Sequence, residues 1–218
     1  MSGSFSSTLT LAAGSVLVCA VLVLWLSSVR SVIRVVAAQG VALGLVAMVL
    51  GTHLHDGGLI ATAAVVLAVK GVAIPVFLRR AGGVDALERE RRPLVNVPAS
   101  LVASAVLIVV AFAALGNLST FVGGTAGALV PVGVATLLLG FFVLVVRRRP
   151  LSQMVGLLLV DNGIALVAFL CTAGVPFLIE LGVSLDVLLG VVVLMVLAQR
   201  LRLEFGDLDL DALQELRD

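Results

Sequence analysis

Two acidic residues lie near the middle of long apolar runs, where a charge is costly. Asp161 lies in the run 151–172 and Asp186 in the run 177–199. Each run is long enough to cross a bilayer, which takes about 20 residues. A charge at the bilayer centre costs about 3 kcal/mol on insertion scales, so two such acids on neighbouring helices need a reason. Transfer of an ion or proton is the commonest reason. The alternative is that each acid bonds to a backbone or hydroxyl group and only locks the helices together.

The spacing to nearby arginines gives the depth of both acids. Asp161 follows Arg149 by twelve residues, roughly 18 Å along a helix, and Asp186 precedes Arg200 by fourteen residues, roughly 21 Å. If both arginine clusters lie at the same membrane face, the two carboxylates lie at about the same depth. We therefore predict that they form a relay near the midplane.

Lys70 is the one basic residue placed well inside a predicted span. It precedes Arg79 by nine residues, roughly 14 Å along the helix, so a snorkelling ammonium would have to climb about two turns. Pro75 follows one turn later, where it frees a backbone carbonyl and favours a kink near Lys70. These features predict a role for Lys70 in a polar pathway or an ion pair.

Three further polar residues accompany the acids. Glu180 comes four residues after Pro176, near the predicted outer face, where it either marks the outer end of a path or is simply solvated. Gln153 precedes Asp161 by eight residues, nearly on the same helix face, and Asn162 follows it directly. The two amides are expected to hydrogen-bond a carboxylate or a water, or to join helices as ordinary packing contacts.

Composition sets the class of protein. Of the 218 residues, 61% are hydrophobic and only 12% are charged, about half the charge of a soluble domain. We predict an all-α integral membrane protein with a single membrane domain at 1–218. The predicted spans, seven in number, are roughly 8–27, 31–50, 59–78, 97–117, 126–146, 151–172 and 177–199.

Arginines in the connecting segments predict the topology. They occur in the first, third and fifth loops and in the C-terminal tail, whereas the N-terminus and the even loops hold no Lys or Arg. The positive-inside rule then places the odd loops and the C-terminus in the cytoplasm and the N-terminus outside. The first run has no preceding Lys or Arg, so we read it as a span and not as a signal peptide. We expect a multi-pass protein of the cytoplasmic membrane.

Other patterns are weaker or exclude functions. Gly40 with Gly44, and Gly123 with Gly127, have the GxxxG spacing that lets helices approach closely in lipid.

His53 and the residues that follow it are better explained as a solvated loop than as a metal site. The chain has no phosphate loop, CxxC or Ser-His-Asp pattern. We expect no catalysis by this chain alone, no cofactor or metal, and no nucleic-acid partner.

The two-helix unit at 147–200 resembles the small subunit K of respiratory complex I. It has an Arg pair, then a Gly and an Asn six residues apart, and later an acid with a Gly four residues on. The residues that match are Gly156, Asn162, Asp186 and Gly190. The acid of the family's second span is replaced by Leu158. Asp161 lies three residues later on the same helix face, so the function is expected to be kept with the acid moved by one turn.

Most of the chain resembles component E of hydrogenase-four and formate-hydrogenlyase-type complexes. The motifs lie in 70–75 and 150–190: Lys70 with Ile74-Pro75, Asp161-Asn162-Gly163, and Glu180-Leu181-Gly182 with Asp186 and Gly190. The resemblance implies a membrane-arm subunit of an energy-converting hydrogenase or complex-I-like oxidoreductase. Its partners would be other membrane subunits, antiporter-like ones included, and the redox centres would belong to those partners.

This resemblance implies a proton pathway through Asp161, Asp186 and Lys70, with Glu180 at its outer end. Two alternatives stay open. One is a subunit of a multi-subunit cation/proton antiporter, and the other is a structural membrane anchor whose acids brace helices.

Overall fold

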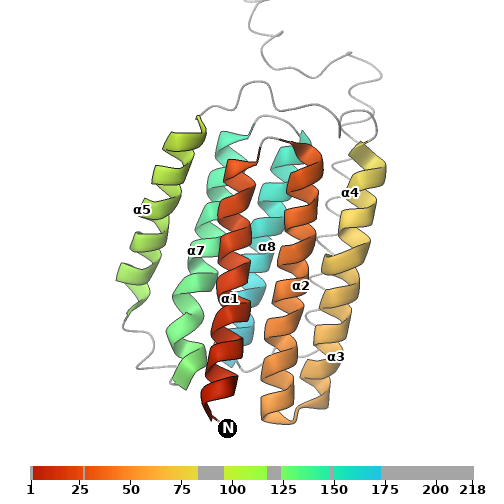
Figure 1. Cartoon of the computed structure of the whole chain (residues 1–218), viewed down its shortest axis with the longest axis vertical. Coiled ribbons are helices and arrows are strands. Elements are labelled where there is room, and N and C mark those ends of the chain that lie inside the picture. The colour runs from red at the N-terminus through yellow and green to blue at the C-terminus, as the bar shows by residue number, and fades with distance from the viewer. Residues whose placement is uncertain (1, 27, 83–95, 117–123, 148–149, 173–218) are drawn as a thin grey trace, which may run out of the picture.

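The computed structural model describes residues 2–26, 28–82, 96–116, 124–147 and 150–172, and its regular elements are helices that lie side by side (Figure 1). In chain order they are α1 (Ser2–Trp25), α2 (Val29–Leu54), α3 (Gly57–Val66), the π-helix η1 (Leu67–Ala73), α4 (Ile74–Gly82), α5 (Val97–Leu115), α7 (Gly124–Val146) and α8 (Pro150–Thr172).

Six of these helical segments are long and apolar enough to cross a membrane, with α3, η1 and α4 forming one continuous span over Gly57–Arg80. This confirms a multi-pass membrane protein, and the regular elements of the described residues are all helices. The six agree with the first six predicted spans to within a few residues; the first begins earlier than predicted, at Gly3. The predicted seventh span, 177–199, lies outside the described residues.

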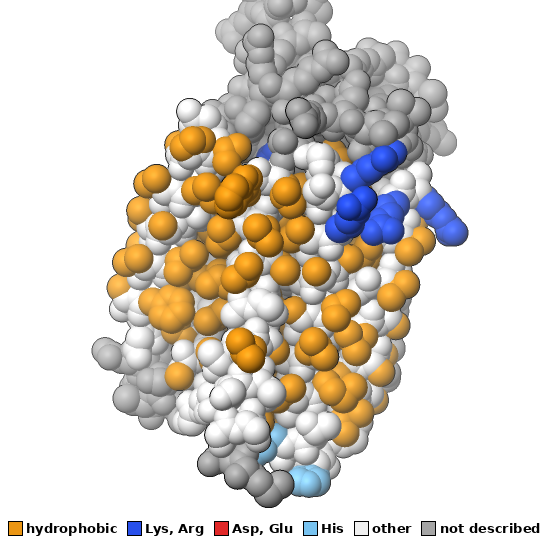
Figure 2. Space-filling view, in the orientation of Figure 1, with side chains coloured by type: hydrophobic (Ala, Val, Ile, Leu, Met, Phe, Trp, Pro, Cys, Tyr) orange, Lys and Arg blue, Asp and Glu red, His pale blue; other side chains and the backbone are white. Residues whose placement is uncertain are grey.

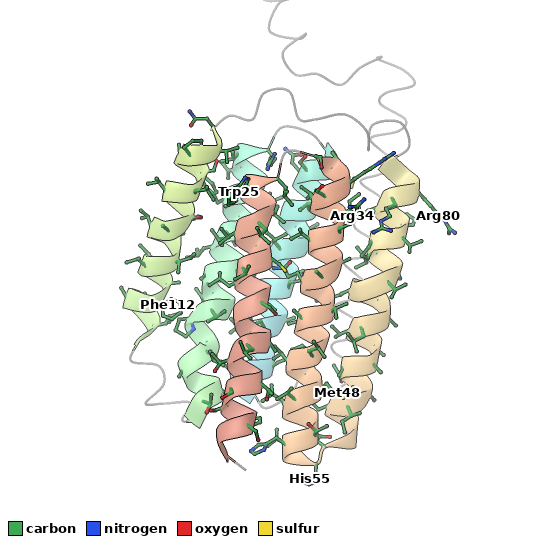
Figure 3. All side chains as sticks on the ribbon, viewed as in Figure 1. Trp25, Arg34, Met48, His55, Arg80 and Phe112 are labelled. Atoms are coloured by element: carbon green, nitrogen blue, oxygen red, sulfur yellow. The ribbon has the colours of Figure 1, made fainter. Side chains whose placement is uncertain are left out.

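The two ends of the bundle differ in charge. Side chains of Lys and Arg gather at the upper end, over α2 and α4, and histidines lie at the opposite end (Figure 2). Arg34 and Arg80 lie at the upper end and His55 at the lower end (Figure 3). Trp25, which is 62% exposed, also lies near the upper end, a place that suits an aromatic ring at a membrane interface. Arginines that the sequence places in the odd-numbered loops thus lie at one end of the helix bundle. Which end faces the cytoplasm stays a prediction.

Among the described helices, α7 and α8 make the most extensive contact, and glycines form part of it. A Cβ built on Gly140 would lie 2.5 Å from the backbone nitrogen of Val160, and one on Gly163 would lie 2.5 Å from that of Leu137. Small residues are what let helices approach in lipid, where dispersion replaces the hydrophobic effect as the driving force. Four glycines with a spacing of seven residues on each helix form this interface: Gly133, Gly140, Gly156 and Gly163.

A second glycine contact joins α2 to the third span. Gly40 and Gly44, the predicted GxxxG pair, face η1: a Cβ on Gly40 would lie 2.6 Å from the carbonyl of Lys70, and one on Gly44 would lie 2.5 Å from the side chain of Leu67. The prediction of close helix packing is therefore confirmed for this pair. Gly123 of the other pair lies outside the described residues.

Polar side chains close several helix ends. The Oδ1 atom of Asp56 accepts hydrogen bonds from the backbone N–H of Gly58 at 2.8 Å and of Leu59 at 3.3 Å, which caps the N-terminus of α3. His53, predicted to lie in a solvated loop, belongs to the last turn of α2, and its ring stacks on Phe5 with the centroids 3.8 Å apart. Asp56 thus fixes the start of α3, and the stacked rings join the end of α2 to the start of α1.

Candidate functional site

An ion pair between Lys70 and Asp161 lies inside the bundle. Nζ of Lys70 is 2.7 Å from Oδ2 of Asp161, and the two side chains are 3% and 6% exposed. The sequence predicted a polar pathway or an ion pair for Lys70 and a midplane position for Asp161. The structure brings the two residues together.

Both partners come from the middle of their spans. Asp161 is the twelfth residue of α8, which has 23, and Lys70 is the fourteenth of the 24 in the Gly57–Arg80 span. Each charge alone would be costly at this depth, and an opposite charge in contact offsets part of that cost. The site is thus a neutral pair made of two charges that neither helix could carry cheaply by itself.

A π-helical turn presents Lys70. Over Leu67–Ala73 the helix is wider than an α-helix, and the N–H of Ile74 bonds back five residues to the carbonyl of Val69. Pro75 follows directly and cannot donate a hydrogen bond to the turn before it. The sequence predicted a kink at this place, and the structure shows a π-helix there. Such turns are frequent at functional sites because they redirect side chains.

The α7–α8 interface fixes Asp161. Gly163, two residues along α8, lies against the backbone of Leu137, and Gly156 lies against the backbone of Leu144. Gly156, predicted to support the acids, thus acts by packing. Leu158, where the resemblance places an acid, is buried in the same apolar cluster as Ile74 of α4. Asp161 therefore faces the third span one turn away from Leu158.

A line of hydrogen bonds through two amides begins at Asn162, the residue that follows Asp161. Asn162 Nδ2 donates to Gln39 Oε1 at 3.0 Å, and Gln39 Nε2 donates to the carbonyl of Val16 at 3.0 Å. Asn162 is 3% exposed and Gln39 is fully buried. The line joins α8, α2 and α1. Sequence reasoning proposed Asn162 but missed Gln39. The signal that could have identified Gln39 is its position: it is a lone amide in an apolar span and directly precedes Gly40, the first glycine of the GxxxG pair.

The other predicted residues lie elsewhere. Gln153 is exposed near the start of α8, and its Nε2 donates to the carbonyl of Arg147 at 3.2 Å; the structure does not bring it to Asp161, which is eight residues away or roughly 12 Å along the helix. Pro75 lies one turn beyond Lys70, as described above. Glu180, Asp186 and Gly190 lie outside the described residues.

Arg147 has a role that the sequence did not suggest. Its guanidinium is buried at the end of α7, where Nη2 donates to the carbonyls of Val23 at 3.0 Å and Leu26 at 3.1 Å. These carbonyls belong to the end of α1, where a cation also suits the helix dipole. The residue therefore fastens α7 to α1 near the arginine-bearing end of the bundle.

Within the part of the chain that the structure describes, no group of three or more His, Cys, Asp and Glu side chains is placed to hold a metal ion. Among the described residues, the groups at the buried site are one carboxylate, one ammonium and two amides. Such a set can hold, release and redirect a proton. It contains no hydroxyl or thiol nucleophile.

Comparison with known proteins finds similarity over nearly the full length to one protein and over part of the chain to others. The chain is 43% identical over 216 residues to the uncharacterized protein Rv0085 of Mycobacterium tuberculosis, covering 99% of this chain and 98% of that protein. It is also 35% identical over 80 residues to hydrogenase-4 component E of Escherichia coli K12 and of Shigella flexneri, and this match covers 37% of either chain. No family model and no solved structure matches. The chain therefore belongs to the family of protein Rv0085 of Mycobacterium tuberculosis.

Proposed function

We propose that this chain is a membrane-arm subunit of an energy-converting respiratory hydrogenase or complex-I-like oxidoreductase, and that Lys70 and Asp161 form part of its proton pathway. The observation that carries the proposal is the 2.7 Å contact between two opposite charges at mid-span. The partial similarity to hydrogenase-4 component E supports the type of complex. Electron transfer would take place in other subunits.

The pair can couple a proton to a movement of charge. While Asp161 is a carboxylate, Coulomb attraction holds the Lys70 ammonium against it. When a proton binds Asp161, that attraction is lost, and the ammonium is drawn to another carboxylate. When Lys70 returns, it favours the ionised form of Asp161 and the proton leaves. An event elsewhere in the complex that moves Lys70 would thereby drive a proton on or off Asp161.

Asp186 and Glu180 extend this pathway in the proposal. Asp186 would be the second carboxylate near the midplane that alternates with Asp161, and Glu180 would be the outer end of the path. The support for both is the sequence: each lies in or beside the apolar run 177–199. Asn162 would hold α8 in register and would not itself carry the proton, since an amide does not titrate.

The test uses the native complex in inverted membrane vesicles. Asp161→Asn keeps the shape and removes the titrating proton, so we expect electron transfer without coupled proton uptake. Thr136→Val is the control, because Thr136 is fully buried but bonds only to Val132 of its own helix α7. Normal pumping by Asp161→Asn would overturn the proposed role and leave the acid as a structural brace.

The type of complex has its own test. Mild detergent purification of the tagged chain should yield hydrogenase or dehydrogenase subunits together with antiporter-like subunits. Recovery of antiporter subunits without any redox protein would contradict a redox complex and assign the chain to a cation/proton antiporter.

A further inference from the structure

Two neighbouring residues of α2 touch the two helices that carry the ion pair. Gly40 contacts the backbone of Lys70, and Gln39 bonds to Asn162, the residue next to Asp161. We infer that Gln39 and Gly40 are positioning residues that together set the separation of Lys70 and Asp161. This inference deepens the proposed function and rests on it, because it assigns the control of the same site to α2.

The Gly40 contact leaves no room for a side chain. A Cβ at this position would lie 2.6 Å from both the carbonyl carbon and the carbonyl oxygen of Lys70, and 3.0 Å from the nitrogen of Gly71. On the other side, a Cβ on Gly71 would lie 3.1 Å from Cγ2 of Val41. Two glycines therefore bring the backbones of α2 and η1 into contact at the residue that carries the charge. The position of Lys70 along the axis of α2 is therefore set by contacts between backbone atoms, which cannot rotate away as a side chain can.

The Gln39 contact fixes the other partner. Its amide is fully buried, and both ends are engaged: Nε2 with the carbonyl of Val16 and Oε1 with Nδ2 of Asn162. A donor at one end and an acceptor at the other allow one orientation of the amide. Because a buried amide that loses its partner costs about 1–3 kcal/mol, the bond resists sliding of α8 along α2. Since Asn162 and Asp161 are adjacent, the bond also sets the height of the carboxylate.

The two contacts act through one rigid element. Gln39 and Gly40 are consecutive residues of a single helix, so a shift of α2 acts on both members of the ion pair at once. Gln39 also binds α1 through Val16, which links the pair to a helix that does not carry either charge. The distance between Lys70 and Asp161 is therefore kept when α2 moves together with both partners, and it changes when either contact with α2 is lost.

The first test compares two glycines on the same face of α2. Gly40→Ala presses on the backbone of Lys70, whereas Gly44→Ala meets mainly the flexible side chain of Leu67. The measurement is the infrared difference spectrum between acidic and alkaline pH of membranes that contain the assembled complex, following the carboxyl band of Asp161, which is identified by its loss in Asp161→Asn. We expect Gly40→Ala to shift this band and Gly44→Ala to leave it in place. Equal effects of the two variants would overturn the role of Gly40.

The second test needs no added volume, so it stays decisive if Gly40→Ala does not assemble. Gln39→Leu removes both hydrogen bonds, and the matched control Thr136→Val removes a buried hydroxyl that bonds within α7. We expect Gln39→Leu to shift the Asp161 band and the pH at which proton uptake by vesicles is half-maximal, and Thr136→Val to change neither. An unchanged band in Gln39→Leu would overturn the role of Gln39.

The infrared readout distinguishes failure of the proposed function from failure of the positioning role. If Asp161→Asn pumps normally, the proposed function fails, yet the band of Asp161 still reports whether Gln39 and Gly40 position it. If Asp161→Asn stops pumping while neither α2 variant moves the band, the proposed function stands and the positioning role is wrong.

Discussion

Nζ of Lys70 lies 2.7 Å from Oδ2 of Asp161, although the two residues belong to spans that are separated by two others in the chain. Each side chain is almost completely enclosed. Removing one partner of a buried ion pair costs about 3–5 kcal/mol because the other charge stays buried, whereas replacing both by apolar groups is often neutral or stabilising. The stability of the bundle should therefore depend on the balance of charge more than on either residue.

Neutralising the two charges together should cost less than neutralising one. We expect Asp161→Asn and Lys70→Met each to lower the unfolding temperature of the purified protein in detergent, and the double variant Asp161→Asn with Lys70→Met to recover part of the loss. The coupling in this double-mutant cycle should be about 0.5–3 kcal/mol, the range for residues in direct contact. Additive effects would mean that the pair is not formed in the folded protein.

The glycine interface of α7 and α8 gives a prediction that is independent of charge. Gly163→Ala would drive a Cβ to within 2.5 Å of the backbone of Leu137, so we expect reduced accumulation in the membrane and a lower unfolding temperature. Gly14→Ala in α1 is the control, since a Cβ there meets nothing within 4 Å and alanine favours a helix by about 1 kcal/mol. If both variants unfold alike, these helices do not pack as described.

Arg147 should matter for stability more than the other arginines at its end of the bundle. Its two hydrogen bonds to the end of α1 involve a charged donor, a type of bond worth about 1.5–3 kcal/mol. We expect Arg147→Gln to lower the unfolding temperature clearly and Arg34→Gln, at an exposed residue of α2, to have little effect. A matched loss in both would show that the arginines act only through net charge.

The positions of the spans, and the energetic cost of placing charges inside them, could be predicted from the sequence because both follow from local composition. Runs of apolar residues predicted six spans that the structure bears out, and the depth of Lys70 predicted that it would find a polar partner. The identity of that partner could not be deduced, since Lys70 and Asp161 are far apart in the chain and only the packing of α2, η1 and α8 brings them together. The same holds for the bond between Gln39 and Asn162.

Backbone packing explains the rest of what the sequence left open. The GxxxG pattern of Gly40 and Gly44 was recognised, but the pattern does not say which helix will approach, and the structure shows η1. The glycines of α7 and α8 are spaced by seven and were not recognised as an interface. The sequence places Arg147 with the other arginines of the fifth loop. No neighbouring residue in the sequence distinguishes a buried arginine that binds a distant helix end from a solvated arginine.

The topology is open to direct labelling. The arginine-bearing end of the bundle should face the cytoplasm, because the positive-inside rule applies to the short loops on that side. Single cysteines, Gly58→Cys and Ala86→Cys, are introduced in a background without Cys19 and Cys171. We expect an impermeant thiol reagent added outside intact cells to label the first and spare the second. The reverse result would invert the orientation.

A further prediction concerns which positions of α8 can carry the acid. Asp161→Asn should abolish coupled proton uptake, and Leu158→Glu in that background should restore part of it. Leu158 lies one turn away on the same helix and is buried beside the third span, so a longer carboxylate there can reach toward Lys70.

The same logic applies to the second acid. Asp186→Asn should weaken uptake, while Asp186→Glu should keep much of it, since both carboxylates titrate. Vesicle proton uptake per electron transferred is the measurement, and the amount of assembled complex is matched across variants. If Asp161→Asn and Asp186→Asn both give normal uptake in assembled complexes, the acids do not carry the proton, and the ion pair serves to hold η1 against α8.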